Sequence, residues 1–316
     1  MILESGTVDL SAVGIMNNVF VEKLRREHFI PQPGKYGSEL VQRVFQRKDM
    51  LFALVLLALF LGVALFAPLL SPYDPNKINL QNKNLGPSQE HLMGTDYLGR
   101  DLLSRILIGA RTSLSISLGV VIISLFVGIS AGCLAGYYGG FVDESISRVI
   151  DIFLAFPGLI FALAIMGMLE TGIFNMILAL SIVQWAKYAR LMRGQVLSLK
   201  KQEFVLSAVT SGAGDFHIIY KHIVPNAIAP LLVLATIDVG HVILSIATLS
   251  FLGIGLPTNI PEWGAMLSAG KGFMRTAPLQ TVFPGIAITF IVVVFSILGD
   301  GVRDILDPNH EGGEMY

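Results

Sequence analysis

Few residues of this sequence are spaced for catalysis or phosphate binding. The stretch from Gly264 to Gly272 comes nearest to a phosphate-binding loop, in which GxxxxGK precedes Ser or Thr so that backbone amides hold phosphate and a hydroxyl reaches magnesium. This stretch has one residue too many between its glycines and ends in glycine. The sequence contains no HExxH or CxxC motif and no plausible Ser, His and Asp set. We therefore expect no catalytic residue, no metal site and no bound ATP or Mg²⁺ in this chain.

Asp238 and His241 lie three residues apart within a long apolar stretch and so share one face of a helix. An ionisable group inside a membrane is costly and usually faces water or a polar partner. One interpretation is that the pair lines a polar path and meets a charged or polar substrate. The other is a mutual hydrogen bond that ties helices together, and the spacing leaves both open.

Composition explains why these groups would lie in a membrane. The 316-residue chain is 53% hydrophobic and only 14% charged, with a mean hydropathy of +0.67, whereas a soluble domain carries about 25% charged residues. A net charge of −1 provides no basic field for nucleic acid, which is therefore not an expected partner. Cys133 is the sole cysteine, so no disulfide can form within the chain.

Six apolar segments are long enough to cross about 30 Å of hydrocarbon, which takes roughly 20 helical residues. We therefore expect an all-α polytopic membrane protein with six transmembrane helices. The expected spans are residues 51–70, 112–138, 151–169, 171–186, 227–256 and 279–299.

The orientation of these spans is predicted from Lys and Arg, which collect in cytoplasmic flanks. Most of the 22 Lys and Arg residues fall in the tail before Leu51 and in the loop between the fourth and fifth spans. This distribution predicts cytoplasmic N- and C-termini, with a retained tail 1–50 before a membrane domain 51–316. Within that domain we expect outer loops 71–111 and 257–278, a cytoplasmic loop 196–226 and a cytoplasmic tail 300–316.

Glycines recur every four residues along the second span. Gly128, Gly132, Gly136 and Gly140 form a repeated GxxxG pattern, which lets another helix approach closely in lipid. The pattern favours a tightly packed helix inside the bundle. A contact with another subunit is the alternative.

The loop between the fourth and fifth spans is polar and rich in turns. Residues 201–211 predict a short helix that Gly212 and Gly214 end, and Asp215 is expected to cap a second helix. Pro225 should end that second helix, whose apolar residues at helical spacing are Phe216, Ile219, Tyr220 and Ile223. Such a stripe suits either a groove in a soluble partner or the membrane surface.

The two outer loops carry residues that predict ordered turns. The first contains the run HLMGTDYLGRD from His91 to Asp101, and the second contains Pro261-Glu262-Trp263-Gly264. Trp263 is either an anchor at the membrane interface or part of a functional site.

The cytoplasmic loop resembles the EAA loop of ABC-transporter permease subunits in its Gly212 and its Ile-Val-Pro at residues 223–225. The resemblance covers nearly everything after Phe45 and is to the second, C-type permease of a heterodimeric pair. Four further stretches, in the family's order, are similar to the dipeptide, oligopeptide and nickel permease family: residues 91–115, 135–157, 250–267 and 283–308.

The resemblance implies a type I ABC importer permease in a bacterial inner membrane, forming half of the pathway for short peptides. The implied partners are a second homologous permease, two ATPase subunits that carry ATP and Mg²⁺, and an extracytoplasmic binding protein. Nickel or a metal chelate is the alternative substrate. From other classes, a non-transporting membrane scaffold or sensor is a rival, and the missing catalytic set argues against a membrane-embedded enzyme.

The resemblance implies that Ser207, Ala208, Gly212, Ile223 and Pro225 belong to the loop that docks on the ATPase. The acidic residue that names the loop should fall at position 206, which is Leu206 here, and Glu203 lies one turn earlier. The candidate docking loop is completed by Glu203, Asp215, Phe216, Ile219 and Tyr220.

In the outer loops, the candidate contacts for the binding protein are Asp96, Arg100, Asp101, Glu262 and Trp263. Asp238 and His241 are candidates for the substrate path from their spacing alone, which the resemblance does not settle.

Overall fold

The computed structural model describes residues 47–306, and this part of the chain is helical. The expectations for residues 1–46 and 307–316 lie outside the described residues. The elements, in chain order, are α3 (Lys48–Leu70), η1 (Leu80–Asn82), α4 (Leu102–Tyr138), α5 (Gly140–Ala155), α6 (Gly158–Met168), α7 (Ile173–Leu199), α8 (Glu203–Thr210), α9 (Asp215–Ile218), the π-helical turn η2 (Ile219–Ile223), α10 (Val224–Phe251), α11 (Trp263–Gly270), η3 (Lys271–Phe273) and α12 (Leu279–Leu306).

Within residues 47–306, four helical stretches are long and apolar enough to cross a membrane, which confirms a polytopic membrane protein. They are α3, α4, α12 and the continuous stretch Asp215–Phe251. The pair α5 and α6 makes a fifth if it is counted as one bent span. The helix α7 is not among them, and its second half contains Lys187, Arg190 and Arg193. Six spans therefore remain a prediction.

The expected span 151–169 is not one continuous helix. The helices α5 and α6 meet at an angle of 91°. Phe156 has extended backbone angles (φ −97°, ψ 144°) directly before Pro157, because a proline ring disfavours helical geometry at the preceding residue. The helix α4 also begins earlier than expected, at Leu102, where the Asp101 carboxylate accepts a hydrogen bond from the backbone of Ser104.

A glycine seam joins α4 and α7, which run in the same direction. A Cβ atom added at Gly128, Gly132 or Gly136 would lie under 3.0 Å from atoms of α7. The contacts move from Tyr188 toward Val196 as the glycines advance along α4. Three of the four predicted glycines thus pack inside the chain, whereas Gly140 starts α5 and has open space around it.

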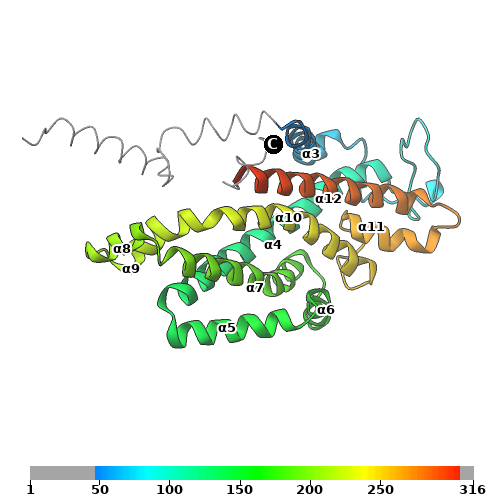
Figure 1. Cartoon of the computed structure of the whole chain (residues 1–316). Helices are drawn as coiled ribbons and strands as arrows, with labels where there is room; N and C mark the ends of the chain where they lie inside the picture. Colours follow the sequence, from blue (N-terminus) through cyan, green and yellow to red (C-terminus); the bar gives the residue numbers. More distant parts are fainter. Residues whose placement is uncertain (1–46, 307–316) are drawn as a thin grey trace, which may run out of the picture. The chain divides into compact units, whose positions relative to one another are not determined.

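The remaining helices flank this seam. Figure 1 shows α7 between α5 and α10, with α12 on the far side of α10. The helix α3 packs against α4 and α12. Short helices lie at opposite ends of the long ones: α8 and α9 at one end, and α11 at the other (Figure 1). The fold therefore separates the predicted cytoplasmic loop from the predicted outer loops.

Candidate functional site

The predicted cytoplasmic loop, residues 196–226, contains two short helices around a glycine turn. The helix α8 covers most of the predicted segment 201–211, and Gly212 follows it with a φ of +78°, a conformation that glycine adopts without strain. The turn is closed by the Ala213 N–H, which donates to the Ala208 carbonyl at 3.1 Å. The Ser207 carbonyl likewise accepts from the Ser211 N–H at 3.0 Å. This hydrogen bonding makes the loop an ordered hairpin of helices.

Three apolar side chains anchor the hairpin to the bundle. Val205, Ile218 and Ile223 are fully buried. They pack in one cluster with apolar residues at the ends of α4, α7 and α10, namely Cys133, Tyr137, Met192, Val196, Ala227 and Leu231. The hairpin is therefore held by a hydrophobic core of its own.

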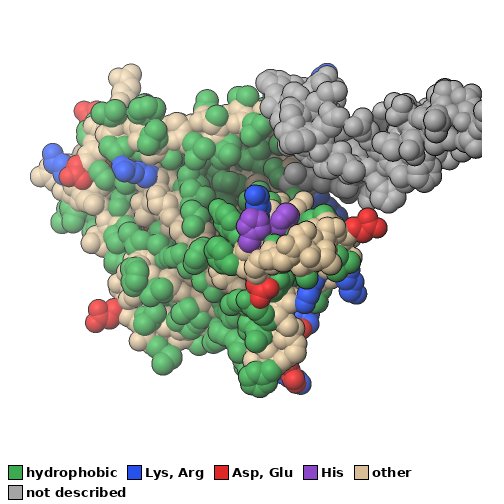
Figure 2. Space-filling view, turned by 90° about the vertical axis from the view of Figure 1, so that its left-hand side faces the viewer, with side chains coloured by type: hydrophobic (Ala, Val, Ile, Leu, Met, Phe, Trp, Pro, Cys, Tyr) green, Lys and Arg blue, Asp and Glu red, His purple; other side chains and the backbone are tan. Residues whose placement is uncertain are grey.

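The opposite side of the hairpin exposes aromatic and aliphatic side chains. The rings of Phe216 and Tyr220 stack in parallel with centroids 6.1 Å apart, and the residues are 81% and 71% exposed. Phe204, Leu206 and Val209 on α8 are also exposed. Figure 2 faces this end of the molecule and shows hydrophobic side chains beside histidine side chains. We call the five apolar residues the exposed hairpin surface.

The structure corrects the predicted stripe. Phe216 and Tyr220 point outward, but Ile223 is buried and Ile219 is only partly exposed. The reason is the π-helical turn η2, in which one turn holds more residues than in an α-helix and so rotates Ile223 inward.

The predicted helix boundary at Pro225 is also wrong. Pro225 does not end a helix, because η2 leads directly into α10 and the Val224 N–H donates to the Ile219 carbonyl. The side chain of Asn226, the next residue, donates to the His222 carbonyl at 2.6 Å. A π turn at this place accommodates the proline without a break in the helix.

Asp215 does not cap α9, whose N-cap residue is Gly214. The Asp215 carboxylate instead accepts a hydrogen bond from the Tyr137 hydroxyl at 2.9 Å. The Tyr137 carbonyl in turn accepts from the Lys200 ammonium. These contacts tie α9 to the end of α4, and Glu203 stays exposed on the first turn of α8.

Asp238 is buried at 2% exposure and forms a polar cluster between α7 and α10. Its Oδ2 accepts a hydrogen bond from the Tyr188 hydroxyl at 2.6 Å and forms an ion pair with the Lys187 ammonium at 2.7 Å. His241 Nδ1 lies 3.6 Å from Oδ1, and its side chain is 63% exposed. Asp238 thus ties helices together, with partners the sequence analysis missed, and the side chains of Lys187 and His241 reach the surface.

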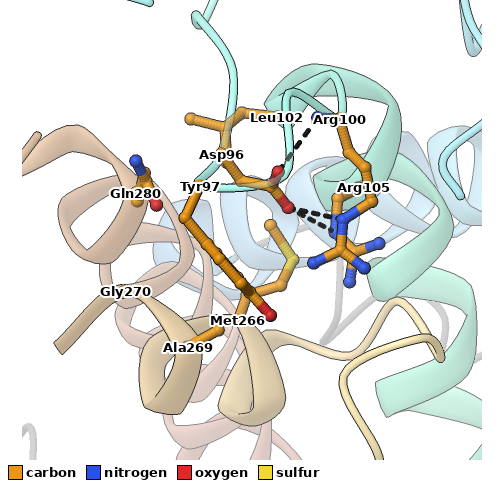
Figure 3. A pocket seen from close by; sticks show the side chains of 9 residues that line it. All are labelled: Asp96, Tyr97, Arg100, Leu102, Arg105, Met266, Ala269, Gly270 and Gln280. Carbon is orange, nitrogen blue, oxygen red and sulfur yellow. Dashed lines mark hydrogen bonds and ion pairs between the residues drawn. The ribbon is translucent and has the colours of Figure 1, made fainter. Parts of the chain in front are cut away.

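Two arginines join the outer loops around Asp96 (Figure 3). Arg100 Nε lies 2.6 Å from Asp96 Oδ2, and Arg105 Nε lies 3.8 Å from it. Both guanidinium groups also donate to one oxygen in the second loop, the carbonyl of Thr258, at 3.0 and 2.8 Å. The two predicted outer loops therefore form one connected structure. The sequence analysis did not identify Arg105 as part of it.

The second outer loop begins α11 with a buried carboxylate. Glu262 accepts from the backbone N–H groups of Gly264 and Ala265 at 2.7 and 2.8 Å and from the hydroxyls of Ser113 and Ser250. Burial raises the pKa of Glu262 above its usual value, and the two backbone N–H donors oppose that shift.

The predicted contacts for a binding protein are buried. Trp263 is 1% exposed, donates to the Ile106 carbonyl at 3.1 Å and packs on Gly109, so it is not an interfacial anchor. The Asp101 carboxylate is equally buried between His91 and Ser104. Asp96, Arg100 and Glu262 are each at most 5% exposed. In this conformation, none of the five predicted side chains is exposed for direct contact with a binding protein, and all five support the loop surface from beneath.

Two family models match this chain. Residues 128–311 match the family described as "Binding-protein-dependent transport system inner membrane component". Residues 35–87 match the "N-terminal TM domain of oligopeptide transport permease C". Among solved structures, the chain is similar to the MetNI methionine ABC transporter in inward-facing conformations, with a TM-score of 0.53 and 16% identity over 64% of this chain and 97% of that one. At that identity the likeness shows the fold alone.

Curated relatives cover most of the chain. The glutathione transport system permease protein GsiD of Escherichia coli O157:H7 is 43% identical over 85% of this chain and 90% of its own length. The dipeptide transport system permease protein DppC of Alkalihalophilus pseudofirmus is 41% identical over 85% and 89%. The nickel transport system permease protein NikC of Escherichia coli K12 is 40% identical over 83% and 95%. The chain therefore belongs to the inner-membrane components of binding-protein-dependent transport systems and is an ABC importer permease of the peptide, nickel and glutathione family.

Proposed function

We propose that this chain forms half of the membrane pathway through which an ATP-driven importer takes up short peptides. A second homologous permease forms the other half, two ATPase subunits bind ATP and Mg²⁺ in the cytoplasm, and an extracytoplasmic binding protein delivers the substrate. In this proposal α7 also crosses the membrane, which gives six spans with both termini in the cytoplasm of a bacterial cell.

The exposed hairpin surface carries this proposal. A protein surface rarely presents a stacked aromatic pair beside three more apolar side chains unless a partner covers them. Its anchors Val205, Ile218 and Ile223 are buried in the ends of the long helices, so a partner that moves the hairpin also moves the bundle. Leu206 lies on this surface at 51% exposure, so apolar contact replaces the acidic contact usual at that position.

A mutation of the stacked pair tests the docking. In the importer reconstituted in liposomes, the double variant Phe216→Ala/Tyr220→Ala should lose ATPase co-purification and ATP-driven uptake, because both rings leave the surface. Phe126→Ala on α4 is the matched control, since Phe126 is 72% exposed and lies outside the hairpin. Normal uptake by the double variant would refute docking at this surface.

A short peptide is the substrate that the relatives favour. Two of the three relatives above are named for a dipeptide and for glutathione, itself a tripeptide. Nickel is the second candidate, because the nickel permease is almost as similar at 40% identity. Uptake of radiolabelled dipeptides, glutathione and ⁶³Ni²⁺ by the same liposomes distinguishes them, and nickel uptake without peptide uptake would overturn the peptide assignment.

A further inference from the structure

Arg111 is an exposed arginine on an otherwise apolar stretch of α4. It lies nine residues after Leu102, about 14 Å along the helix axis at a rise of 1.5 Å per residue. On α4 beside it, Gly109 packs on Trp263 and the Ser113 hydroxyl donates to Glu262. Arg111 is therefore level with α11, at the outer end of the proposed pathway.

The Arg111 side chain has no ion pair or hydrogen bond with any other residue between 47 and 306. The buried Arg105 nearby has both a carboxylate and carbonyl oxygens around it, and Arg190 and Arg193 each pair with a carboxylate of α5. A guanidinium at the edge of the membrane is costly unless water or an anion meets it. Among the arginines of α4 and α7, Arg111 is therefore the one whose guanidinium group is available to bind an anion from outside the chain.

A cavity of about 250 Å³ lies against Arg111. Ser115 supplies a hydroxyl to its lining, and the Thr112 hydroxyl, which also lines it, already donates to the Ile108 carbonyl at 3.2 Å. The apolar wall consists of Ile116, Ile173 and Ile177. A hydroxyl and a guanidinium are donors that recognise an oxyanion, and Arg does so with two parallel N–H bonds. The volume is below the range typical of a whole-ligand pocket, so it suits one end of a molecule.

The cavity lies on the same side of α7 as the Asp238 cluster. Ile173 and Gln184 are eleven residues apart, about three helical turns, and Lys187 follows three residues later on that face. Ile173 and Lys187 are 14 positions apart, which corresponds to about 21 Å along the helix. All three residues are exposed or partly exposed. One face of α7 thus leads from the cavity to the Lys187–Asp238 pair.

We propose that Arg111 and Ser115 form an oxyanion pocket at the outer end of the pathway, which receives a carboxylate of the incoming substrate. The proposal rests on the proposed function and adds the substrate group that is recognised. A lipid phosphate is the other source of the same chemistry, and the experiment separates the two.

The test uses the complete importer in liposomes with its binding protein. Radiolabelled Ala-Phe and its C-terminal amide are the probes, and Arg111→Gln, Arg111→Lys and the wild type are compared. We expect Arg111→Gln to lower the uptake of the free acid about tenfold but that of the amide less than twofold, since a charge-assisted bond to carboxylate contributes about 1.5–3 kcal/mol. Arg111→Lys should recover part of the loss. Arg148→Gln, a substitution of an exposed arginine on α5, should change neither uptake.

Thiol labelling at position 111 provides a second measurement, which tests the pocket even if the binding protein does not bind the peptide amide. In a Cys133→Ala background, the Arg111→Cys variant should react with a membrane-impermeant thiol reagent added outside, and unlabelled Ala-Phe with its binding protein should slow the reaction. Leu59→Cys on the apolar helix α3 is the unreactive control.

Three results would each refute the proposed pocket: an equal loss of uptake for the free acid and the amide, unchanged uptake of the free acid in Arg111→Gln, or labelling of Arg111→Cys that the peptide does not slow. The last result would favour lipid phosphate as the bound anion. Failure of the wild-type importer to take up any peptide would instead count against the proposed function.

Discussion

The Lys187–Asp238 pair should contribute measurably to the stability of the permease. Asp238→Ala leaves the Lys187 ammonium and the Tyr188 hydroxyl without the oxygen that both reach within 2.7 Å. Bonds to charged groups contribute about 1.5–3 kcal/mol in soluble proteins, but bonds within membrane bundles average about 0.6 and reach about 1.7 kcal/mol. The Lys187 side chain is 30% exposed, which screens its charge further. We therefore expect Asp238→Ala to lower the free energy of unfolding by about 2 kcal/mol, with a coupling of about 1 kcal/mol to Lys187.

A double-mutant cycle measures this coupling. Purified permease carrying Asp238→Ala, Lys187→Met or both is unfolded by SDS in mixed micelles and followed by tryptophan fluorescence. The double variant should be less destabilised than the sum of the single variants, because Lys187→Met removes the charge that Asp238→Ala leaves unpaired. Asp300→Ala, at an exposed position on α12, controls for loss of a carboxylate. A coupling energy below about 0.5 kcal/mol, the limit of ordinary additivity, would refute the pair as a stabilising contact.

Three further predictions concern the glycine seam, the glycine turn and the outer cap. Gly132→Val should lower the melting temperature of the permease, because its Cβ would lie 2.6 Å from atoms of α7, whereas Gly194→Val, with open space around it, should not; equal melting temperatures would contradict the seam. Gly212→Val should leave the protein inserted but reduce uptake and substrate-stimulated ATPase activity, because a φ of +78° costs a branched residue about 1–2 kcal/mol. Gly214→Val is the control, since Gly214 has a φ of −70°. Normal uptake by Gly212→Val would exclude a rigid hairpin. Glu262→Gln should destabilise α11 by about 1–3 kcal/mol, because the amide turns a donor toward backbone N–H groups; an unchanged melting temperature would show that the carboxylate is dispensable.

Spacing and composition predicted the features that depend on local patterns. Long apolar runs predicted α3, α4 and α12, and the GxxxG repeat predicted close packing inside the chain. The Gly212 turn followed from two glycines after a helical segment. These features need no knowledge of distant residues, because a helix and a glycine turn are determined by the residues within them.

The features that sequence analysis missed depend on contacts far along the chain. Lys187 was counted as a cytoplasmic charge, but it lies beside Asp238, 51 positions away. Arg105 binds the Thr258 carbonyl, and periodicity carries no information on that partner. Pro225 predicted a helix end, yet the π turn before it keeps the helix continuous. In each case, tertiary structure supplied a partner or a geometry that local propensity cannot encode.

The π turn has a mechanical consequence. Because it joins α9 to α10 without a break, the chain is helical from Asp215 to Phe251. The 22 residues between Phe216 and Asp238 form a strut of about 33 Å. A helix resists compression along its axis, so a displacement of the stacked rings would be carried through Pro230 toward Asp238. Under the proposed function, the docking of an ATPase on the hairpin and a change at the Lys187–Asp238 pair would then be two ends of one movement, and no separate signal would have to pass between them.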